Sequence, residues 1–277
     1  MNNFKGFFTF IAFIWLWSCG IWAFAHGIYS GEIAWFGLLL NAWALPVWML
    51  LRYFRAPRYS GDLRETPAFT ALLVGLAVVL LTDSEKGMPL YLAIYNLFAV
   101  LVYLFHLSAL TQPHGLPAGE PFPALNAVGG QWRSQQAASA GDCAGLLLVF
   151  LRGSYCADSR CLLAGLQEIE ETLARRNICP VLISTESRER WRRWWPAGAR
   201  GEWLQLNSGD DNPWFVAAAG APLWIRLLGG SAAACRPGIW LLERDGTVVW
   251  RHLPGNYRVP GNAEMLRGQL FRIEEDE

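Results

Sequence analysis

The sequence predicts a protein of two parts: a bundle of transmembrane α-helices at the N-terminus and an α/β domain at the C-terminus. Two observations support this fold class. Long uncharged apolar segments fill the first 110 residues, and most Lys and Arg residues come after them. Beyond a stretch rich in Pro and Gly, short apolar runs alternate with amphipathic segments, which is the β-α-β pattern of a parallel sheet.

We expect a transmembrane domain at residues 1–111, a Pro/Gly linker at 112–121 and the α/β domain at 122–277. About twenty apolar residues are needed to cross a hydrocarbon core. Four segments approach this length, at about 7–25, 33–51, 68–82 and 90–110. The third is the shortest, so it is either a short span or a re-entrant helix. A cleavable signal peptide is the alternative for the first segment, whose apolar stretch is long for one.

The cations of the N-terminal part predict its orientation. Lys5 precedes the first segment, and the loop between the second and third segments holds Arg52, Arg55, Arg58 and Arg64. The positive-inside rule places these residues in the cytoplasm. With four spans the α/β domain returns to the cytoplasmic side of a membrane of the bacterial inner-membrane type. If the third segment does not cross, the domain faces the outside.

Asn41, Asn96 and Cys19 lie inside the apolar segments. Asn41 and Asn96 are expected to hydrogen-bond across helices, because an unpaired amide in hydrocarbon is costly. Cys19 lies far along the chain from the other cysteines and is expected to pack as a small apolar residue.

The chemistry is predicted in Gly145–Cys161, GLLLVFLRGSYCADSRC. Leu146–Phe150 is a continuous apolar run, typical of a strand buried on both faces, and a Gly-Ser-Tyr turn ends it. An amphipathic helix follows, with apolar residues at helical spacing. Cys156 therefore falls at or just before the helix N-terminus, where unpaired backbone N–H groups and the helix dipole favour a thiolate, the nucleophilic form of cysteine. Arg152 and Arg160 could add to this effect.

Cys161 follows Cys156 by five residues, which in a continuous helix is a rise of about 7.5 Å. This exceeds the Cα separation that a disulfide tolerates, so the first helical turn must unwind before the two sulfurs can meet. A mechanism follows in which Cys156 is oxidised or attacks a substrate disulfide, and Cys161 resolves the intermediate. The alternative is that both are small, buried, inert residues.

This strand, the RG-x-x-C turn, the amphipathic helix and the later RP-x-x-W-L-L-E-R-D-G stretch at residues 236–246 resemble the peroxiredoxin-like redoxins, the alkyl hydroperoxide reductase/thiol-specific antioxidant group. The resemblance covers roughly Phe122 to Phe271. It implies a thioredoxin-like fold, and the C-x4-C spacing resembles the bacterioferritin-comigratory type of peroxiredoxin. By this resemblance Cys156 is the attacking cysteine and Cys161 the resolving one. It also implies a thioredoxin-like thiol electron donor and a peroxide or disulfide substrate.

The turn differs from that family in two respects. Such peroxiredoxins have a threonine three residues before the attacking cysteine, and here that position is Gly153, with Ser154 beside it. We expect Gly153, Ser154 and Tyr155 to contact the substrate. Because the family's threonine and the proline turn ahead of the cysteine are absent, thiol-disulfide exchange with a protein client stays an alternative.

A second segment is expected at the same site. Pro237 aligns with the proline that thioredoxin-like folds hold in cis beside the active cysteines, and we expect it to contact substrate. Arg236 is the candidate cation for stabilising the Cys156 thiolate, and the alternative is a surface arginine. Cys235 could accept a disulfide from Cys156. Cys143 is expected to be structural and Cys179 to be buried.

The other elements expected in the α/β domain are local. They are a hairpin at 122–133 turned by Gly129-Gly130, a strand at 180–184, a helix at 186–195, a strand at 203–206, a short helix at 213–219, a hairpin of strands 238–243 and 247–251, and a helix at 263–273. In the 186–195 helix, Trp191, Trp194 and Trp195 share a face, which either packs on the sheet or docks on the membrane surface.

Other chemistries are not indicated. The zero formal net charge argues against nucleic-acid binding. The sequence holds no Gly-rich phosphate loop, C-x-x-C pair, His/Glu metal cluster or serine nucleophile motif, so we expect no cofactor and no metal. The predicted function is a membrane-anchored thiol-dependent oxidoreductase, a peroxiredoxin-like peroxidase. The alternatives are a thiol-disulfide exchange protein and a non-catalytic membrane scaffold.

Overall fold

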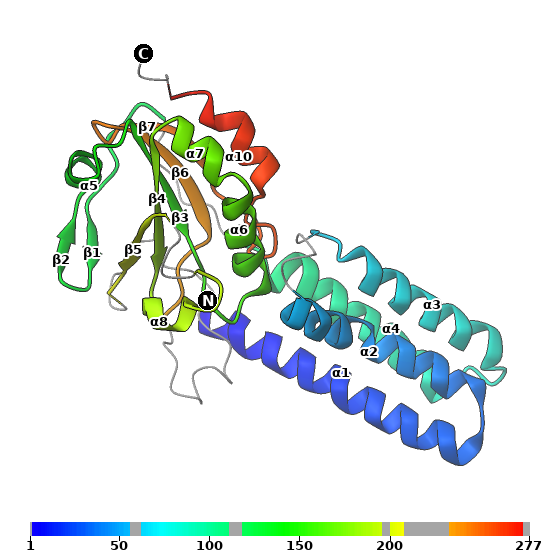
Figure 1. Ribbon diagram of the computed structural model, residues 1–277. Coiled ribbons are helices and arrows are strands. Elements are labelled where there is room, and N and C mark those ends of the chain that lie inside the picture. The colour runs from blue at the N-terminus through cyan, green and yellow to red at the C-terminus, as the bar shows by residue number, and fades with distance from the viewer. Residues whose placement is uncertain (1, 56–61, 111–117, 196–199, 208–232, 274–277) are drawn as a thin grey trace. The chain divides into compact units, whose positions relative to one another are not determined.

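The computed structural model describes residues 2–55, 62–110, 118–195, 200–207 and 233–273. Among these, the residues up to Ala109 form one compact unit and those from Leu110 onward form a second (Figure 1). The helix predicted at 213–219 lies outside the described residues, as do Arg58 and most of the predicted linker.

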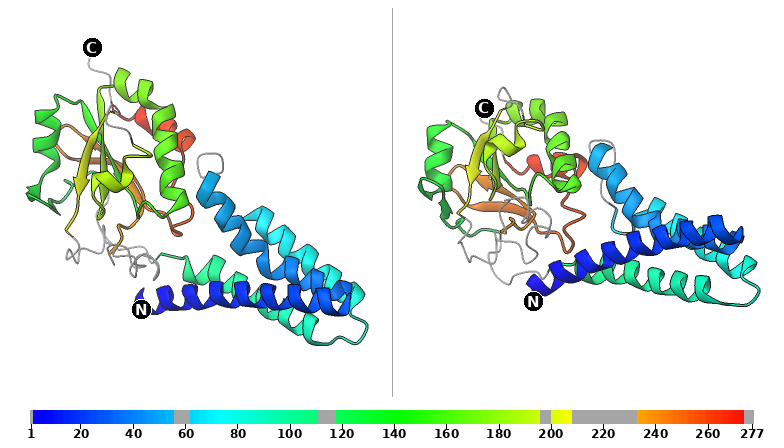
Figure 2. Two further views of the ribbon diagram at one scale, coloured as in Figure 1. Left: turned by 60° about the horizontal axis from the view of Figure 1, so that its bottom comes forward. Right: turned by 90° about the horizontal axis from the view of Figure 1, so that it is seen from below.

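The secondary structure described for the first unit is helical. Its helices are α1 (Asn2–Ser30), α2 (Ile33–Arg55), α3 (Thr66–Thr82) and α4 (Met88–Val102), which continues as the π-helical turn η2 (Tyr103–Leu107). Three described stretches, in α1, in α2 and in α4 with η2, are long and apolar enough to cross a membrane, and α3 is a shorter apolar helix of 17 residues. Figure 2 shows the four helices side by side.

Close packing and buried amides hold this unit together. A Cβ atom on Gly75 of α3 would lie 2.5 Å from the backbone nitrogen of Asn41, so only glycine allows α2 and α3 to approach this closely. Asn96 Nδ2 donates to Asn41 Oδ1 at 3.0 Å, and Asn41 Nδ2 donates to Leu72 O at 3.0 Å. The predicted hydrogen bond between helices is thus confirmed. Cys19 is buried beside this pair, with its Sγ 3.5 Å from Asn96 Nδ2.

The second unit is organised on a five-stranded sheet of order β5-β4-β3-β6-β7. Its strands are β3 (Gly145–Phe150), β4 (Ile178–Ser184), β5 (Glu202–Gln205), β6 (Gly238–Glu243) and β7 (Val248–His252). The first three are parallel, and β6 and β7 are antiparallel to their neighbours. All six residues of the central strand β3 are buried, as expected for its continuous apolar run.

Helices cover both faces of the sheet (Figure 1). One face packs against α6 (Ala157–Glu168), α7 (Glu170–Arg175), the short α8 (Arg188–Trp191) and α10 (Ala263–Leu270). The other face is covered by α5 (Ser134–Ala140) and the small hairpin of β1 (Leu125–Ala127) and β2 (Gly130–Trp132). This is the α/β thioredoxin-like arrangement that the sequence resemblance predicts.

Two predicted helices are shorter than expected. The helix predicted at 186–195 is the single turn α8, which ends at Trp191. The helix after Cys156 divides at Ile169, which has φ −106° and ψ 8°. Trp191 and Trp195 are buried against the sheet, so core packing is confirmed for them.

Candidate functional site

Cys156 is the residue at which the chain turns from β3 into α6. It is the N-cap of α6, in extended backbone conformation with φ −88° and ψ 115°. Its backbone nitrogen donates to Gly153 O at 3.0 Å, and its carbonyl accepts from Arg160 N at 3.2 Å. The sulfur therefore lies at the positive end of a 12-residue helix, where the sequence places it.

The thiol of Cys156 faces a carboxylate. Cys156 Sγ donates to Asp158 Oδ2 at 3.9 Å, and both residues are nearly buried. Ser159 Oγ accepts from the backbone nitrogen of Arg152 at 3.2 Å, which fixes the start of α6 to the end of the strand. Asp158 was not among the site residues expected from the sequence. Its signal was an acidic residue in the first helical turn, two positions after the cysteine.

Buried charged side chains hold the backbone of the Gly-Ser-Tyr turn. Ser154 N donates to Glu186 Oε2 at 2.6 Å, and Arg160 Nε donates to Ser154 O at 2.5 Å. The Arg160 guanidinium also lies 4.1 Å from the centre of the Trp194 ring. Glu186 comes just after β4, so the parallel pairing of β3 and β4 brings it to the turn. Sequence reasoning missed Glu186, because its partner is 32 residues away.

Tyr155 occupies the space above Gly153. A Cβ atom on Gly153 would lie 2.3 Å from Tyr155 Cε1, so any side chain there would collide with the ring. The Tyr155 hydroxyl is buried and has no hydrogen-bond partner among the described residues. Burial raises the pKa of Tyr155 well above its usual value; the Arg152 charge opposes this, and Cys156, Glu186 and Cys235 add to it. The hydroxyl thus stays protonated and has a hydrogen bond to give.

Arg152 lies on the same side of the turn. Its guanidinium stacks over the Tyr257 ring at 3.8 Å from the ring centre and lies 5.7 Å from the centre of the Tyr155 ring. Arg152 is only 8% exposed. Stacking on an aromatic face positions a cation that burial would otherwise disfavour.

Residues 235–237 reach the same edge of the sheet. Phe150 of β3 pairs with Gly238 of β6, so the residues just before β6 lie where β3 ends. Arg236 is 2% exposed, and burial lowers its pKa. The alternative of a surface arginine is therefore wrong. The expectation of a cis bond at Pro237 is also wrong, because the described part of the chain has no cis peptide bond.

Cys161 is on α6, five residues after Cys156, and is partly exposed. None of Cys156, Cys161 and Cys235 is in a disulfide. Because Cys156 and Cys161 belong to one continuous helical segment, a bridge between them requires the first turn of α6 to open.

Cys143 and Cys179 form a disulfide, with 5.9 Å between their Cα atoms. Cys143 precedes β3 and Cys179 lies in β4, so the bond joins two neighbouring parallel strands at their N-terminal ends. The expectation that Cys179 is simply buried is wrong, since it is partly exposed and bonded. The available signal was that both cysteines lie at the start of strands expected to be parallel.

No family model matches the chain, and no curated protein matches it. Solved structures do. AhpC of Mycobacterium tuberculosis has 12% identity and a TM-score of 0.37, over 58% of this chain and 95% of that one. A Chlorobium tepidum protein named as a thiol:disulfide interchange protein, DsbE, has 17% identity and a TM-score of 0.36, over 58% and 100%. Reduced Prx3 of Vibrio vulnificus in complex with hydrogen peroxide has 14% identity and a TM-score of 0.40, over 56% and 99%.

Proposed function

We propose that the protein is a membrane-anchored thiol-dependent oxidoreductase in which Cys156 attacks the substrate and Cys161 resolves the product. The observation that carries this proposal is the hydrogen bond from the Cys156 thiol to the Asp158 carboxylate at the N-terminus of α6. A carboxylate can accept the proton as sulfur becomes a nucleophile. The helix dipole and the buried Arg236 cation favour the resulting negative charge.

The reaction we favour is peroxide reduction. Cys156 Sγ attacks one oxygen of a hydroperoxide; an S–O bond forms, the O–O bond breaks, and the other oxygen leaves as an alcohol or water after taking a proton. Cys156 is then a sulfenic acid. The first turn of α6 opens, Cys161 attacks Cys156 Sγ, a disulfide forms and water leaves. An external dithiol of the thioredoxin-like class then reduces the disulfide by exchange and is itself oxidised.

Gly153 has no side chain that could bond the substrate, and Tyr155 supplies this contact. Its hydroxyl is protonated, buried and unpartnered among the described residues, and Cys156 is the next residue. We assign it the donation of a hydrogen bond to the oxygen on which negative charge develops when the O–O bond breaks. Ser154 contributes its backbone, because both of its main-chain groups already hold the turn. Pro237 and Gly153 line the same turn.

Thiol-disulfide exchange with a protein client is the second candidate. It is favoured by Gly153, which offers no side-chain hydroxyl for a peroxide. In this reaction Cys156 Sγ attacks a client disulfide, and Cys161 or Cys235 releases the client from the mixed disulfide. Neither cysteine is in a disulfide.

The geometry of the helical unit supports four membrane crossings. Lys5 Nζ donates to the carbonyls of His106 at 3.3 Å and Ala109 at 3.1 Å, so the start of α1 and the end of η2 lie at the same end of the bundle. This arrangement supports an even number of crossings. By the positive-inside rule that end, with Lys5, Arg55 and Arg64, faces the cytoplasm of a bacterial inner-membrane type, and the redox domain follows on the same side. Reporter fusions at the C-terminus should be active only as cytoplasmic reporters; activity of a periplasmic reporter would contradict this topology.

The chemistry is tested on the full-length protein, reduced, in detergent micelles. Hydrogen peroxide and an organic hydroperoxide are mixed with it in a stopped-flow instrument, and the cysteines are then mapped by mass spectrometry. A peroxidase forms a stoichiometric Cys156–Cys161 bridge far faster than a free thiol reacts. If only a disulfide substrate produces the bridge, the protein is an exchanger. If neither does, the redox domain is a non-catalytic scaffold.

A further inference from the structure

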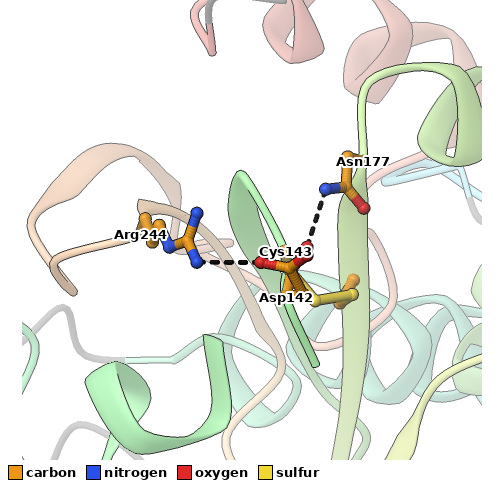
Figure 3. Close-up of a disulfide and its surroundings, with 5 residues drawn as sticks. Asp142, Cys143, Asn177 and Arg244 are labelled. Atoms are coloured by element: carbon orange, nitrogen blue, oxygen red, sulfur yellow. Dashed lines mark hydrogen bonds and ion pairs between the residues drawn. A yellow bond between two sulfur atoms is a disulfide. The ribbon is translucent and has the colours of Figure 1, made fainter. Parts of the chain in front are cut away.

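The Cys143–Cys179 disulfide is held in place by contacts that do not involve its sulfurs (Figure 3). Asn177 Nδ2 donates to Asp142 O at 2.7 Å, and Arg244 pairs with the Asp142 carboxylate at 2.9 Å. Asp142 and Asn177 have φ of 47° and 49°, in the left-handed region that non-glycine residues rarely adopt. Since these turns are fixed by hydrogen bonds and by strand pairing, the two cysteines stay in register when the bond between them opens.

A groove opens beside this disulfide. Its volume is about 670 Å³, and both cysteines line it together with residues of α5, α7 and the first residues of β4 and β5. Clefts of this volume are of the size that binds small organic ligands. The disulfide therefore forms part of the wall of a space that a small molecule can enter.

The two sulfurs are not equally open to the groove. Cys143 is 1% exposed, and the backbone of Gly141 covers it: a Cβ atom on Gly141 would lie 2.7 Å from Cys143 Sγ but 3.7 Å from Cys179 Sγ. Cys179 is partly exposed. An incoming nucleophile therefore meets Cys179 Sγ, and Cys143 is the leaving thiolate.

Both signs of charge line the groove. Arg133 and Arg200 supply cations, and Glu170 and Glu202 supply carboxylates. A ligand that carries both carboxylate and ammonium groups can pair with each, whereas a simple anion would meet the two glutamates. These groups are side chains of α7, of β5 and of the segments next to α5 and β5.

We propose that this groove is a second redox site, where the Cys143–Cys179 disulfide exchanges with a low-molecular-weight thiol that is a small zwitterionic peptide. The thiolate attacks Cys179 Sγ, a mixed disulfide forms and the S–S bond to Cys143 breaks, leaving a Cys143 thiolate that takes a proton. A second thiolate attacks the sulfur of the bound thiol, a free disulfide leaves, and Cys179 is released as a thiol. Two electrons and two protons pass from two thiols to the protein.

This site is independent of the proposed reaction at Cys156. The disulfide lies at the N-terminal end of β3 and Cys156 beyond its C-terminal end, and six strand residues extend about 20 Å. Direct exchange between the two pairs of one chain is therefore excluded in the folded state. The cytoplasmic side proposed for this domain is a compartment in which disulfides are usually transient.

The test uses the full-length oxidised protein in detergent micelles, with glutathione as the probe. After incubation with rising ratios of reduced to oxidised glutathione, the sample is quenched with acid, alkylated and mapped. We expect reduction of the Cys143–Cys179 bridge without unfolding, through a glutathione adduct on Cys179. Reduction only after denaturation, or an adduct on Cys143 alone, would overturn the proposal.

A matched pair of variants separates binding in the groove from mere access. The double change Arg133→Gln with Arg200→Gln should slow reduction by glutathione about twofold to tenfold, the effect of losing one or two ion pairs, and leave the rate with 2-mercaptoethanol unchanged. The control, Arg192→Gln with Arg193→Gln, removes the same charge outside the groove and should change neither rate. Equal rates with glutathione in both double variants would show that the groove does not recognise the ligand. Mapping resolves each cysteine, so loss of activity at Cys156 does not affect the readout.

Discussion

The two ends of β3 each carry a pair of cysteines, and the two pairs are in opposite states. At the N-terminal end Cys143 and Cys179 form a disulfide, and at the C-terminal end Cys156 and Cys161 do not. The backbone explains the difference. Neighbouring parallel strands hold the first two Cα atoms 5.9 Å apart, within the range of a disulfide, whereas α6 separates the second two by a rise of about 7.5 Å.

The two cysteine pairs also differ in the groups that surround them. Around Cys156 lie a carboxylate, buried guanidinium groups and a phenol, all of which can move or stabilise charge. Cys143 and Cys179 are positioned by backbone turns and strand pairing, and charged side chains line the groove beside them. The pair whose cysteines can bond without a change in the backbone is therefore found as a disulfide. The pair that needs the first turn of α6 to open keeps the Cys156 thiol available for reaction.

The largest expected effect is a difference between the two cysteine pairs in their contribution to the rate of oxidation by peroxide. Cys156→Ser should reduce the rate of oxidation by peroxide by at least about 10³-fold, because it removes the nucleophile. The control is Cys143→Ser with Cys179→Ser, which should leave that rate within about twofold, since distant sites act independently. Stopped-flow kinetics on both proteins measures this; equal losses would show that the two ends of β3 do not have separate roles.

The second prediction compares the contributions of the two cysteine pairs to the free energy of unfolding. Removing the Cys143–Cys179 bond, which spans 36 residues, should lower the free energy of unfolding of the α/β domain by about 4 kcal/mol, because the unfolded chain gains entropy. Cys156→Ser with Cys161→Ser removes no bond and should cost far less. Native-state hydrogen exchange in β3 and β4 of the full-length protein reports both values. A similar loss of protection in the two double variants would contradict the comparison.

The third prediction concerns the Asp158 carboxylate, to which the Cys156 thiol donates a hydrogen bond. Asp158→Asn keeps the shape of the side chain but removes the proton acceptor, and should slow the reaction of Cys156 about a hundredfold. Glu168→Gln makes the same charge change at an exposed position near the end of α6 and should have little effect. If both changes slow the reaction equally, the effect comes from total charge rather than from the hydrogen bond to Cys156.

The smallest expected effect is at Tyr155. Tyr155→Phe removes a hydroxyl that has no partner among the described residues, so it should leave stability unchanged and slow peroxide reduction about tenfold. Since burial raises the pKa of Tyr155, the ratio of the wild-type and variant rates should stay constant up to about pH 10, where an exposed tyrosine ionises. A ratio that falls toward one as the pH rises to 9 would contradict the assignment.

The space shared by Gly153 and Tyr155 allows a sharper version of that experiment. Gly153→Thr alone should disturb the turn, because its Cβ would lie 2.3 Å from the Tyr155 ring. Gly153→Thr combined with Tyr155→Ala removes the collision and returns a hydroxyl to the site. Recovery of part of the rate in the combined variant, measured with the same peroxide, would show that the hydroxyl and not the ring is what the substrate needs.

The sequence by itself determined the local elements of this protein. The apolar run of β3, the position of Cys156 at the start of a helix and the four apolar helices were all readable, because each depends on residues that are close along the chain. The Asn41–Asn96 hydrogen bond was also predictable, because a side-chain amide in an apolar helix needs a hydrogen-bond partner on a neighbouring helix.

Tertiary structure alone decided which distant side chains meet. Cys143 bonds Cys179, Glu186 holds Ser154 and Arg236 is buried because the β3–β4 and β3–β6 registers bring these segments to common edges of the sheet. A register is set by the packing of both faces, so no single segment of the sequence contains it. The Tyr155 ring fills the space that a side chain at position 153 would need. This too could not be predicted from the sequence, because it depends on the three-dimensional positions of both residues.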